Sequence, residues 1–331
     1  MQNKKKIEIG IIGVGYWGPN LVRTFSSIDN VQVKYVADKS NDRLDFIKTE
    51  FPTINTVNDF NIILNDKAIS IIVIVTPMET HYEIAKKSLE SGKHIFVEKP
   101  FTVKSNDASE LIKLAKKNNL KIGVGHLFTF HPGIETIKNF IISSNLDTYY
   151  INFNRANLRP PTAKYNVIWD LAVHDIAVAN YLLDQFPIKV GSSSFDYSGR
   201  GLEDMAIIQL EYGSNKFVNI HVGWHTPNKI RNFQLYGDKN SIFFNDLGDP
   251  RLQIFDEGID NREDYQNGLN KELSYGVGEI ICPNIPDTQP LYNECNAFIN
   301  YISNGGHYKN DGESGYWVVK TIEEIITRIN K

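Results

Sequence analysis

Residues 7–18, IEIGIIGVGYWG, constrain the fold of this chain more than any other stretch. A short apolar, β-branched run ends in three glycines, Gly13, Gly15 and Gly18, and passes into residues 19–25, whose apolar side chains have helical spacing. This order of strand, glycine turn and helix predicts a dinucleotide-binding unit. The first glycine permits the tight turn, the second lets the backbone approach a pyrophosphate, and the third lets helix and strand pack closely.

Asp38 bears on which dinucleotide is bound. It ends the next apolar run, Val31–Ala37, twenty residues after Gly18, where a carboxylate is expected to accept the adenosine ribose hydroxyls. A carboxylate there repels a 2′-phosphate, so the sequence favours NAD over NADP. Lys39 and Arg43 lie close by in sequence, and NADP therefore stays open. The alternative role for Asp38 is to cap the following helix.

The length and charge of the chain set further bounds. Its 331 residues exceed the usual size of one compact core and predict two domains, 1–124 and 125–331. A formal net charge of −4 gives no electrostatic reason to expect a nucleic acid as partner. The first apolar run is too short for a signal peptide or a membrane span, and two cysteines imply no disulfide framework. We therefore expect a cytoplasmic protein without a membrane partner.

The first third of the chain alternates short apolar runs with helical patterns, which predicts βαβ units on a parallel sheet. Thr76-Pro77, residues 98–100 (Glu-Lys-Pro) and His126 each follow one of these runs. Ligands bind outside the carboxyl ends of the strands in open parallel sheets. We expect these residues and the glycine loop to meet at one such edge.

After about residue 125 the pattern changes to strands joined by short turns. A helix is expected over residues 132–142 and another over 167–183, and two more close the chain at 290–303 and 315–329. An open, mainly antiparallel sheet in an α+β domain follows from this pattern. Its strands are expected at residues 148–154, 190–197, 205–212, 217–224, 232–236, 242–245 and 252–255.

Two groups carry candidate chemistry. Asp170 and His174 are four residues apart, so on a helix they share one face. His174 is suited to move a proton near neutral pH, although a solvated pair is the alternative, and no third ligand indicates a metal site. Lys99 precedes Pro100, which removes a backbone donor and fixes the turn. An ammonium there would hydrogen-bond a substrate oxygen, whereas the alternative is a surface lysine.

These motifs together resemble the Gfo/Idh/MocA oxidoreductases. The resemblance rests on Gly13–Gly18, Thr76-Pro77-x-x-x-His81, Glu98-Lys99-Pro100 and Asp170-x3-His174, and it spans nearly the whole chain. It implies a Rossmann domain, NAD(P) as cofactor, and Lys99, Asp170 and His174 as the catalytic set. It also implies a homodimer or homotetramer formed through the C-terminal sheet, and a cis Lys99-Pro100 bond. Met78 departs from the polar residue of many members. The cofactor residues that it implies are Gly13, Gly15, Tyr16, Trp17, Gly18, Asp38, Thr76, Pro77, His81, Glu98 and Lys99.

A narrower resemblance concerns the substrate. GVGYWGPNLVR, FNRANLRPP, WDLAVHD and GWHTPNKIRNFQLYG resemble the branch that includes the UDP-N-acetylhexosamine(uronate) 3-dehydrogenases of bacterial surface-sugar pathways. A polar, anionic substrate would suit Arg155, Asn157 and Arg159, and a diphosphate would suit Lys229 and Arg231. Solvated arginines of a β-sheet are the alternative. Lys99, His126, Asp170 and His174 complete the substrate-binding set that we expect.

The predicted function is NAD-dependent hydride transfer between a sugar carbinol and nicotinamide, which gives a 3-keto sugar. The carbinol is C3 of a nucleotide-linked N-acetylhexosamine or its uronate. A 3-keto-sugar reductase and a free polyol or inositol dehydrogenase are the enzyme alternatives. A cofactor-sensing regulator on the same fold is the alternative from another class, and the complete set of Lys99, Asp170 and His174 argues against it.

Overall fold

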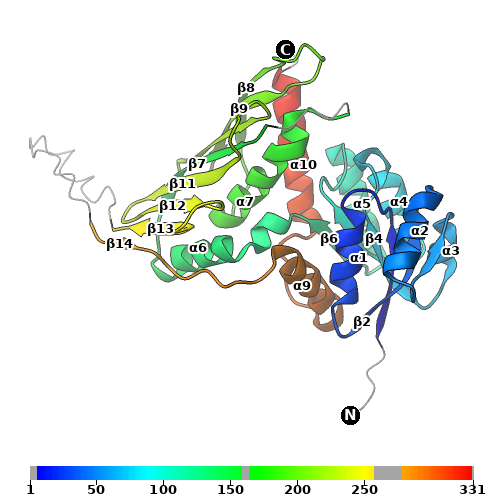
Figure 1. The fold of residues 1–331 in the computed structure, drawn as a ribbon. Coiled ribbons are helices and arrows are strands. Elements are labelled where there is room, and N and C mark those ends of the chain that lie inside the picture. Colours follow the sequence, from blue (N-terminus) through cyan, green and yellow to red (C-terminus); the bar gives the residue numbers. More distant parts are fainter. Residues whose placement is uncertain (1–5, 159–163, 257–277, 330–331) are drawn as a thin grey trace, which may run out of the picture. The chain divides into compact units, whose positions relative to one another are not determined.

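The computed structural model describes residues 6–158, 164–256 and 278–329 (Figure 1). The chain forms two compact units, each described by itself below. The first comprises Met1–Phe130 with Thr288–Lys320, and the second comprises His131–Asp287 with Thr321–Lys331. The units are therefore not separated by a single cut after residue 124, because a late segment of the chain packs with the N-terminal unit.

The first unit is a six-stranded parallel sheet in the order β3-β2-β1-β4-β5-β6. The order reverses between β1 and β4, which is where dinucleotides bind in doubly wound sheets. Its strands are β1 (Ile7–Ile12), β2 (Val31–Ala37), β3 (Asn55–Val57), β4 (Ile69–Ile74), β5 (His94–Glu98) and β6 (Ile122–Gly125). Its helices are α1 (Gly18–Ser26), α2 (Asn41–Glu50), α3 (Asn61–Asn65), α4 (His81–Glu90), α5 (Ser105–Lys117) and α9 (Pro290–Asn304), with 3-10 turns η1 (Met78–Thr80) and η2 (Leu127–Phe130).

The core of this unit explains why α9 belongs to it. Phe96 on β5 has edge contacts with Phe25 on α1, at 5.8 Å between ring centroids, and with Phe298 on α9, at 5.4 Å. Cys295 and Ile299 of α9 are wholly buried in the same cluster. Helix α9 packs against α1 (Figure 1). Burial of this apolar stripe holds a segment nearly two hundred residues away from β5 in the first unit.

The second unit is an eight-stranded sheet in the order β14-β13-β12-β11-β7-β10-β9-β8. The pair β7 and β10 is parallel and the other pairs are antiparallel, so the predicted open, mainly antiparallel sheet is confirmed. Its strands are β7 (Thr148–Ala156), β8 (Lys189–Phe195), β9 (Met205–Tyr212), β10 (Lys216–Gly223), β11 (Ile230–Gly237), β12 (Ser241–Asn245), β13 (Leu252–Phe255) and β14 (Ile280–Ile281).

Side chains alternate between a buried and an outward face along these strands. Ile151 and Phe153 of β7 are buried, as are Phe233 and Leu235 of β11. Helices α6 (Pro132–Ser143) and α7 (Val173–Leu183) lie on one face of the sheet (Figure 1). The chain closes with α10 (Gly312–Ile329). This period of two places each residue of a strand on a definite face.

The helix expected over residues 167–183 has two parts. Ile168–Ala172 form a π-helical turn, η3, and only Val173–Leu183 are α-helical. Such turns widen the helix by one residue and are frequent at functional sites. Because Asp170 lies in the π turn and His174 in α7, their spacing is not that of a regular α-helix.

No helix within the described parts of the chain is both long enough and apolar enough to cross a membrane.

Candidate active site

The three glycines of the loop after β1 differ in whether the protein leaves room for a side chain. Gly13 has φ of +94°, and a Cβ there would lie 2.7 Å from the carbonyl oxygen of Val75. Both the backbone conformation and this contact exclude a side chain at Gly13. A Cβ on Gly18 would lie 2.7 Å from the carbonyl oxygen of Gly13. A Cβ on Gly15 would meet nothing nearer than a guanidinium nitrogen of Arg43, at 3.9 Å. The protein itself requires Gly13 and Gly18, whereas Gly15 borders open space.

Asp38 is fixed at the end of β2 by hydrogen bonds to two backbone segments of the first unit. Its Oδ2 accepts the backbone N–H of Val14 in the glycine loop at 2.8 Å. Its Oδ1 accepts the N–H of Ser40 before α2 at 2.9 Å. A guanidinium nitrogen of Arg43 lies 3.5 Å from Oδ2. The carboxylate therefore holds the loop and the start of α2 together beside a half-exposed cation.

Glu98 joins the glycine loop to the turn at the end of β5. Trp17 donates its indole N–H to Glu98 Oε1 at 3.0 Å, and Lys99 donates its backbone N–H to Oε2 at 3.1 Å. Burial raises the pKa of Glu98 to about 7. The Lys99-Pro100 bond is cis, as predicted. Tyr16, the neighbour of Trp17, is 95% exposed.

His81 braces two strand ends. Its Nδ1 lies 2.8 Å from the carbonyl oxygen of Pro100, and its Nε2 lies 2.8 Å from that of Thr76. The ring is buried, which lowers the pKa of His81, although both carbonyls oppose this effect. Both nitrogens are occupied by the protein, so His81 positions the turns after β4 and β5.

His126 differs from His81 because its ring is buried without partners. Neither ring nitrogen has a hydrogen-bond partner among the described residues, although the side chain is only 1% exposed. Burial and the charge of Lys99 lower the pKa of His126 to about 3, so the imidazole is neutral. Its backbone carbonyl is held by Thr129 and Asn310. Buried polar atoms of this kind are rare in folded proteins and fit contact with a ligand.

In the second unit, Asp170 and His174 are both half-buried. Trp224, which directly follows β10, donates its indole N–H to Asp170 Oδ2 at 3.2 Å. Asn166 Oδ1 accepts the N–H of Trp169 at 3.2 Å at the start of the π turn. The sheet and the π turn therefore position the carboxylate of Asp170.

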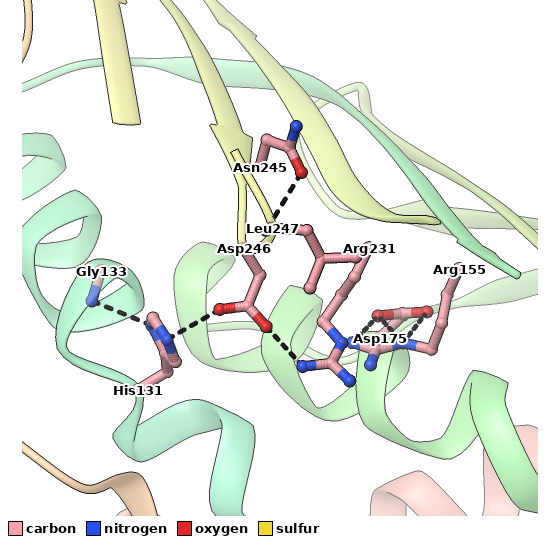
Figure 2. A network of polar contacts seen from close by, with 8 residues as sticks. All are labelled: His131, Gly133, Arg155, Asp175, Arg231, Asn245, Asp246 and Leu247. Carbon is pink, nitrogen blue, oxygen red and sulfur yellow. Dashed lines mark hydrogen bonds and ion pairs between the residues drawn. The ribbon is translucent and has the colours of Figure 1, made fainter. Parts of the chain in front are cut away.

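A chain of charged groups includes Asp175, the sequence neighbour of His174 (Figure 2). Arg155 on β7 donates Nε and Nη2 to the carboxylate of Asp175 at 2.7–3.0 Å. Arg231 on β11 pairs with Asp246 Oδ2. Asp246 Oδ1 lies 3.0 Å from His131 Nε2, while His131 Nδ1 accepts the N–H of Gly133. We call these five charged or titratable residues, Arg155, Asp175, Arg231, Asp246 and His131, the charge network.

The network bears on the predicted substrate residues. Arg155 and Arg231 are paired within the protein, and Lys229 is exposed. Asn157 is half-buried, and its side-chain oxygen has no partner among the residues described. Arg159 lies outside the described residues. The reasoning from sequence missed Asp175, Asp246, His131 and Trp224. The period of two along β7, which puts Arg155 on the same face as buried Ile151 and Phe153, is the signal that could have indicated a buried partner for Arg155.

Among the residues described, no group of three or more His, Cys, Asp or Glu side chains is arranged to hold a metal ion.

Two family models match this chain. Residues 7–126 match an oxidoreductase family with an NAD-binding Rossmann fold, and residues 142–243 match the GFO/IDH/MocA C-terminal domain. The chain belongs to the Gfo/Idh/MocA family. The family inferred from the motifs is confirmed, and so are the Rossmann fold and NAD as cofactor.

Relatives of the Gfo/Idh/MocA family include sugar and cyclitol enzymes. Over 190 residues the chain is 28% identical to a UDP-N-acetylglucosamine 3-dehydrogenase of Acidithiobacillus ferrooxidans, with 56% of each chain covered. It is 26% identical over 266 residues to a scyllo-inositol 2-dehydrogenase (NAD(+)) of Bacillus subtilis, which covers 75% of this chain and 77% of that protein. For two curated relatives, the chain spans little more than half of their length, 54% and 56%.

Structural similarity to a solved relative covers more of the chain than these sequence alignments do. The solved structure of UDP-N-acetylglucosamine 3-dehydrogenase GnnA from Acidithiobacillus ferrooxidans has a TM-score of 0.85, with 20% identity and 98% of both chains covered. The shared fold therefore spans both units of the chain.

The residues at the edge of the parallel sheet fit the NAD of this family. Gly15 leaves room for a pyrophosphate, and the carboxylate of Asp38 is fixed where the adenosine ribose is expected. The unpartnered ring of His126 and the anchored turn of Lys99 lie at the ends of neighbouring strands. These residues would hold the two halves of the dinucleotide.

Proposed function

We propose that this protein is an NAD-dependent oxidoreductase that transfers hydride between a sugar carbinol and nicotinamide. The observation that carries the proposal is the anchored turn of Lys99. It follows β5 at the carboxyl edge of the sheet, and Glu98 ties it to the glycine loop. An ammonium group held beside the dinucleotide is suited to bind the oxygen of a carbinol that loses hydride.

The proposed roles follow from the bonds that the reaction breaks. Oxidation of a carbinol removes a hydride from carbon and a proton from oxygen. NAD, when bound, supplies the hydride acceptor at its nicotinamide ring. Lys99 donates a hydrogen bond to the substrate oxygen and favours its alkoxide form. His174 accepts the hydroxyl proton. Asp170, held by Trp224, orients the imidazole and stabilises its protonated form.

We further propose a nucleotide-linked N-acetylhexosamine, or its uronate, as substrate, with oxidation at C3. The similarity to a UDP-N-acetylglucosamine 3-dehydrogenase supports this choice. Exposed Lys229 and half-buried Asn157 remain to contact a polar, anionic ligand. In this proposal Arg155 holds Asp175 in place and does not bind the substrate, because its guanidinium is paired with the Asp175 carboxylate.

A free polyol is the second candidate, and a specific observation favours it. Arg155 and Arg231 are both paired with buried or half-buried carboxylates, which leaves fewer cations for a diphosphate than the sequence indicates. The similarity to a scyllo-inositol 2-dehydrogenase points in the same direction. Reduction of a 3-keto sugar would use the same residues in reverse.

Thermal stabilisation and NADH formation together separate these candidates. The protein is mixed with NAD and either UDP-N-acetylglucosamine, its uronate or myo-inositol, and Lys99→Ala serves as the matched control. We expect a larger rise in melting temperature with the nucleotide sugars, because a bound ligand stabilises only the folded state. We also expect NADH to form with wild type and not with the variant. An equal or larger effect of myo-inositol would favour the polyol reaction.

We also propose that the protein forms a homodimer or homotetramer through the outward face of the eight-stranded sheet. Tyr150 of β7 stacks between Phe217 of β10 and Tyr236 of β11 on this face, at 6.0 and 5.7 Å between ring centroids. Tyr236 and Ile207 are about two-fifths exposed, at 38% and 41%. Tyr236→Glu should dissociate the oligomer in light-scattering measurements, and a wild-type monomer would refute the proposal.

A further inference from the structure

Glu98 is bound to two segments that act in different parts of the proposed reaction. Trp17, the N-cap residue of α1, belongs to the loop that receives the pyrophosphate, and its indole N–H reaches Oε1 of Glu98. Lys99 belongs to the turn that carries the substrate contact, and its backbone N–H reaches Oε2. Glu98 thus binds Trp17, which lies 81 positions earlier in the sequence, and its own neighbour Lys99.

The carboxyl group has little freedom to move between these donors. The Glu98 side chain is 8% exposed. A Cβ built on Gly125 of β6 would lie 3.0–3.1 Å from its carboxyl atoms, so the glycine backbone packs against the group. A shift of the glycine loop that moves Trp17 must therefore break the indole bond or displace the carboxyl from the Lys99 backbone.

We propose that Glu98 is a positioning residue that couples the glycine loop, through Trp17, to the placement of Lys99. This inference rests on the proposed function of Lys99. When the loop closes on a dinucleotide, the indole holds the carboxyl in place, and the carboxyl holds the Lys99 turn. Lys99 is then positioned correctly only when the cofactor loop is formed.

The surroundings of Glu98 make this link depend on pH. An ionised carboxylate accepts hydrogen bonds about twice as strongly as a neutral acceptor. Burial raises the pKa of Glu98 to about 7, while the charge of Lys99 and the two donors oppose the rise. The link is therefore strong above this pH and weaker below it.

Three buried acids on α9 and after it interact with Glu98, and each is held in its neutral form. Glu294 and Cys295 on α9 and Tyr308 after it are buried, and the charge of Glu98 contributes to raising the pKa of each. Asn310 donates to Glu294 Oε1 and keeps that side chain in place. Among the described residues, Lys99 is the cation whose charge acts on Glu98. Ionisation of Glu98 is therefore opposed chiefly by its own burial and is supported by the charge of Lys99.

The first test needs neither substrate nor cofactor. Total tryptophan fluorescence is followed from pH 5 to 9 in the wild-type chain and in Glu98→Gln, Trp17→Phe and Trp317→Phe, and the part that Trp17→Phe removes is assigned to Trp17. Trp317 has an edge contact with Tyr316 and serves as the matched control. We expect a transition near neutral pH in the wild type and in Trp317→Phe, which is lost in the other two variants. A transition that persists in Glu98→Gln would overturn the assignment of the titrating group.

The second test is a double-mutant cycle on turnover and on NAD affinity. Glutamine at position 98 can accept only one of the two N–H donors, and phenylalanine at position 17 would keep an aromatic ring without the indole N–H. Trp17→Phe and Glu98→Gln should each lower kcat/KM by about tenfold or more, and the double variant should lose much less than the product. The dissociation constant of NAD should change less than kcat. Fully additive losses would overturn the coupling.

The two tests separate this inference from the proposed function. If wild type oxidises no sugar but the pH transition depends on Glu98 and Trp17, the proposed function fails and the link between the residues stands. If wild type is active and the cycle is additive, the coupling alone fails. Circular dichroism and melting temperature of each variant establish that it is folded. Trp17→Phe provides the result if Glu98→Gln does not fold.

Discussion

Removal of Asp175 should destabilise the second unit strongly, because it leaves Arg155 charged and buried. The two side chains are 3% and 10% exposed and form a bidentate pair with an N–O distance of 2.7 Å. Breaking a buried pair by removing one partner costs about 3–5 kcal/mol. At roughly 2–4 °C per kcal/mol for a unit of this size, the melting temperature should fall by roughly 6–20 °C. Asp175→Asn is the perturbation, and thermal unfolding followed by circular dichroism is the assay.

A matched double variant tests whether charge burial is the cause. Replacement of a buried ion pair by apolar residues of similar volume is often neutral or stabilising. Arg155→Met with Asp175→Leu should therefore recover most of the stability that Asp175→Asn loses, as measured by the same unfolding assay. If Asp175→Asn melts within about 2 °C of wild type, a change worth less than about 1 kcal/mol, the pair is not the buried, partner-dependent element described here.

The pair also bears on His174, which precedes Asp175 on α7. Arg155 ties the first turn of α7 to β7, directly after the π turn that holds Asp170. If the pair positions the imidazole, a folded Arg155→Lys variant should lose kcat with little change in NAD affinity, because lysine cannot make the bidentate contact. Unchanged kcat in that variant would limit the pair to stability.

Four other predictions follow from single residues. If Asp38 accepts the ribose hydroxyls, NADH should bind more tightly than NADPH in fluorescence titrations, and Asp38→Ala should narrow the difference; a native preference for NADPH would refute the role. Lys99→Ala and His174→Ala should each lower kcat by about 10²–10⁴-fold. The double variant should lose less than the product of the two single losses, and Asp170→Asn should lose less than either single variant. A His174→Ala enzyme of near-full activity would show that His174 is not the base. Gly13→Ala should lower the melting temperature, since a Cβ would lie 2.7 Å from a carbonyl oxygen, whereas Gly15→Ala should keep it and weaken NAD binding; equal melting losses would contradict this contrast. Burial opposes the charge of Asp246, but hydrogen bonds from His131 and Arg231 hold the pKa of this carboxyl well below the usual 3.8. The contribution of the ionised carboxylate to the free energy of unfolding is therefore present above pH 4 and is lost as the pH falls further. In urea unfolding, Asp246→Asn should destabilise the protein more at pH 7 than at pH 2.

Local signals in the sequence predicted much of the architecture. The β-branched run, the spaced glycines and the helical pattern after them depend on neighbouring residues alone, and the parallel sheet and glycine loop match them. The same holds for β7 to β13 of the second sheet, whose predicted and observed ends differ by two residues or fewer, whereas the two-residue strand β14 was not predicted. The family motifs added the cis Lys99-Pro100 bond, and the matching family models confirm the family and its cofactor.

The tertiary structure decided which polar groups meet. Arg155 pairs with Asp175, twenty positions away, and Trp17 meets Glu98 across 81 positions. The register of neighbouring strands and the packing of a helix on a sheet set these contacts, and no local pattern encodes them. The same reason applies to α9, whose Phe298 completes the first core.

The π turn at Ile168–Ala172 is a further case. A spacing of four predicts a shared helical face only when the helix is regular, and one added residue in the turn changes the direction of Asp170 relative to α7. The sequence by itself predicted the candidate site residues and, within about two residues, the ends of most strands. Only the folded chain decided that arginines expected at the substrate are paired with carboxylates, because a buried charge requires a partner.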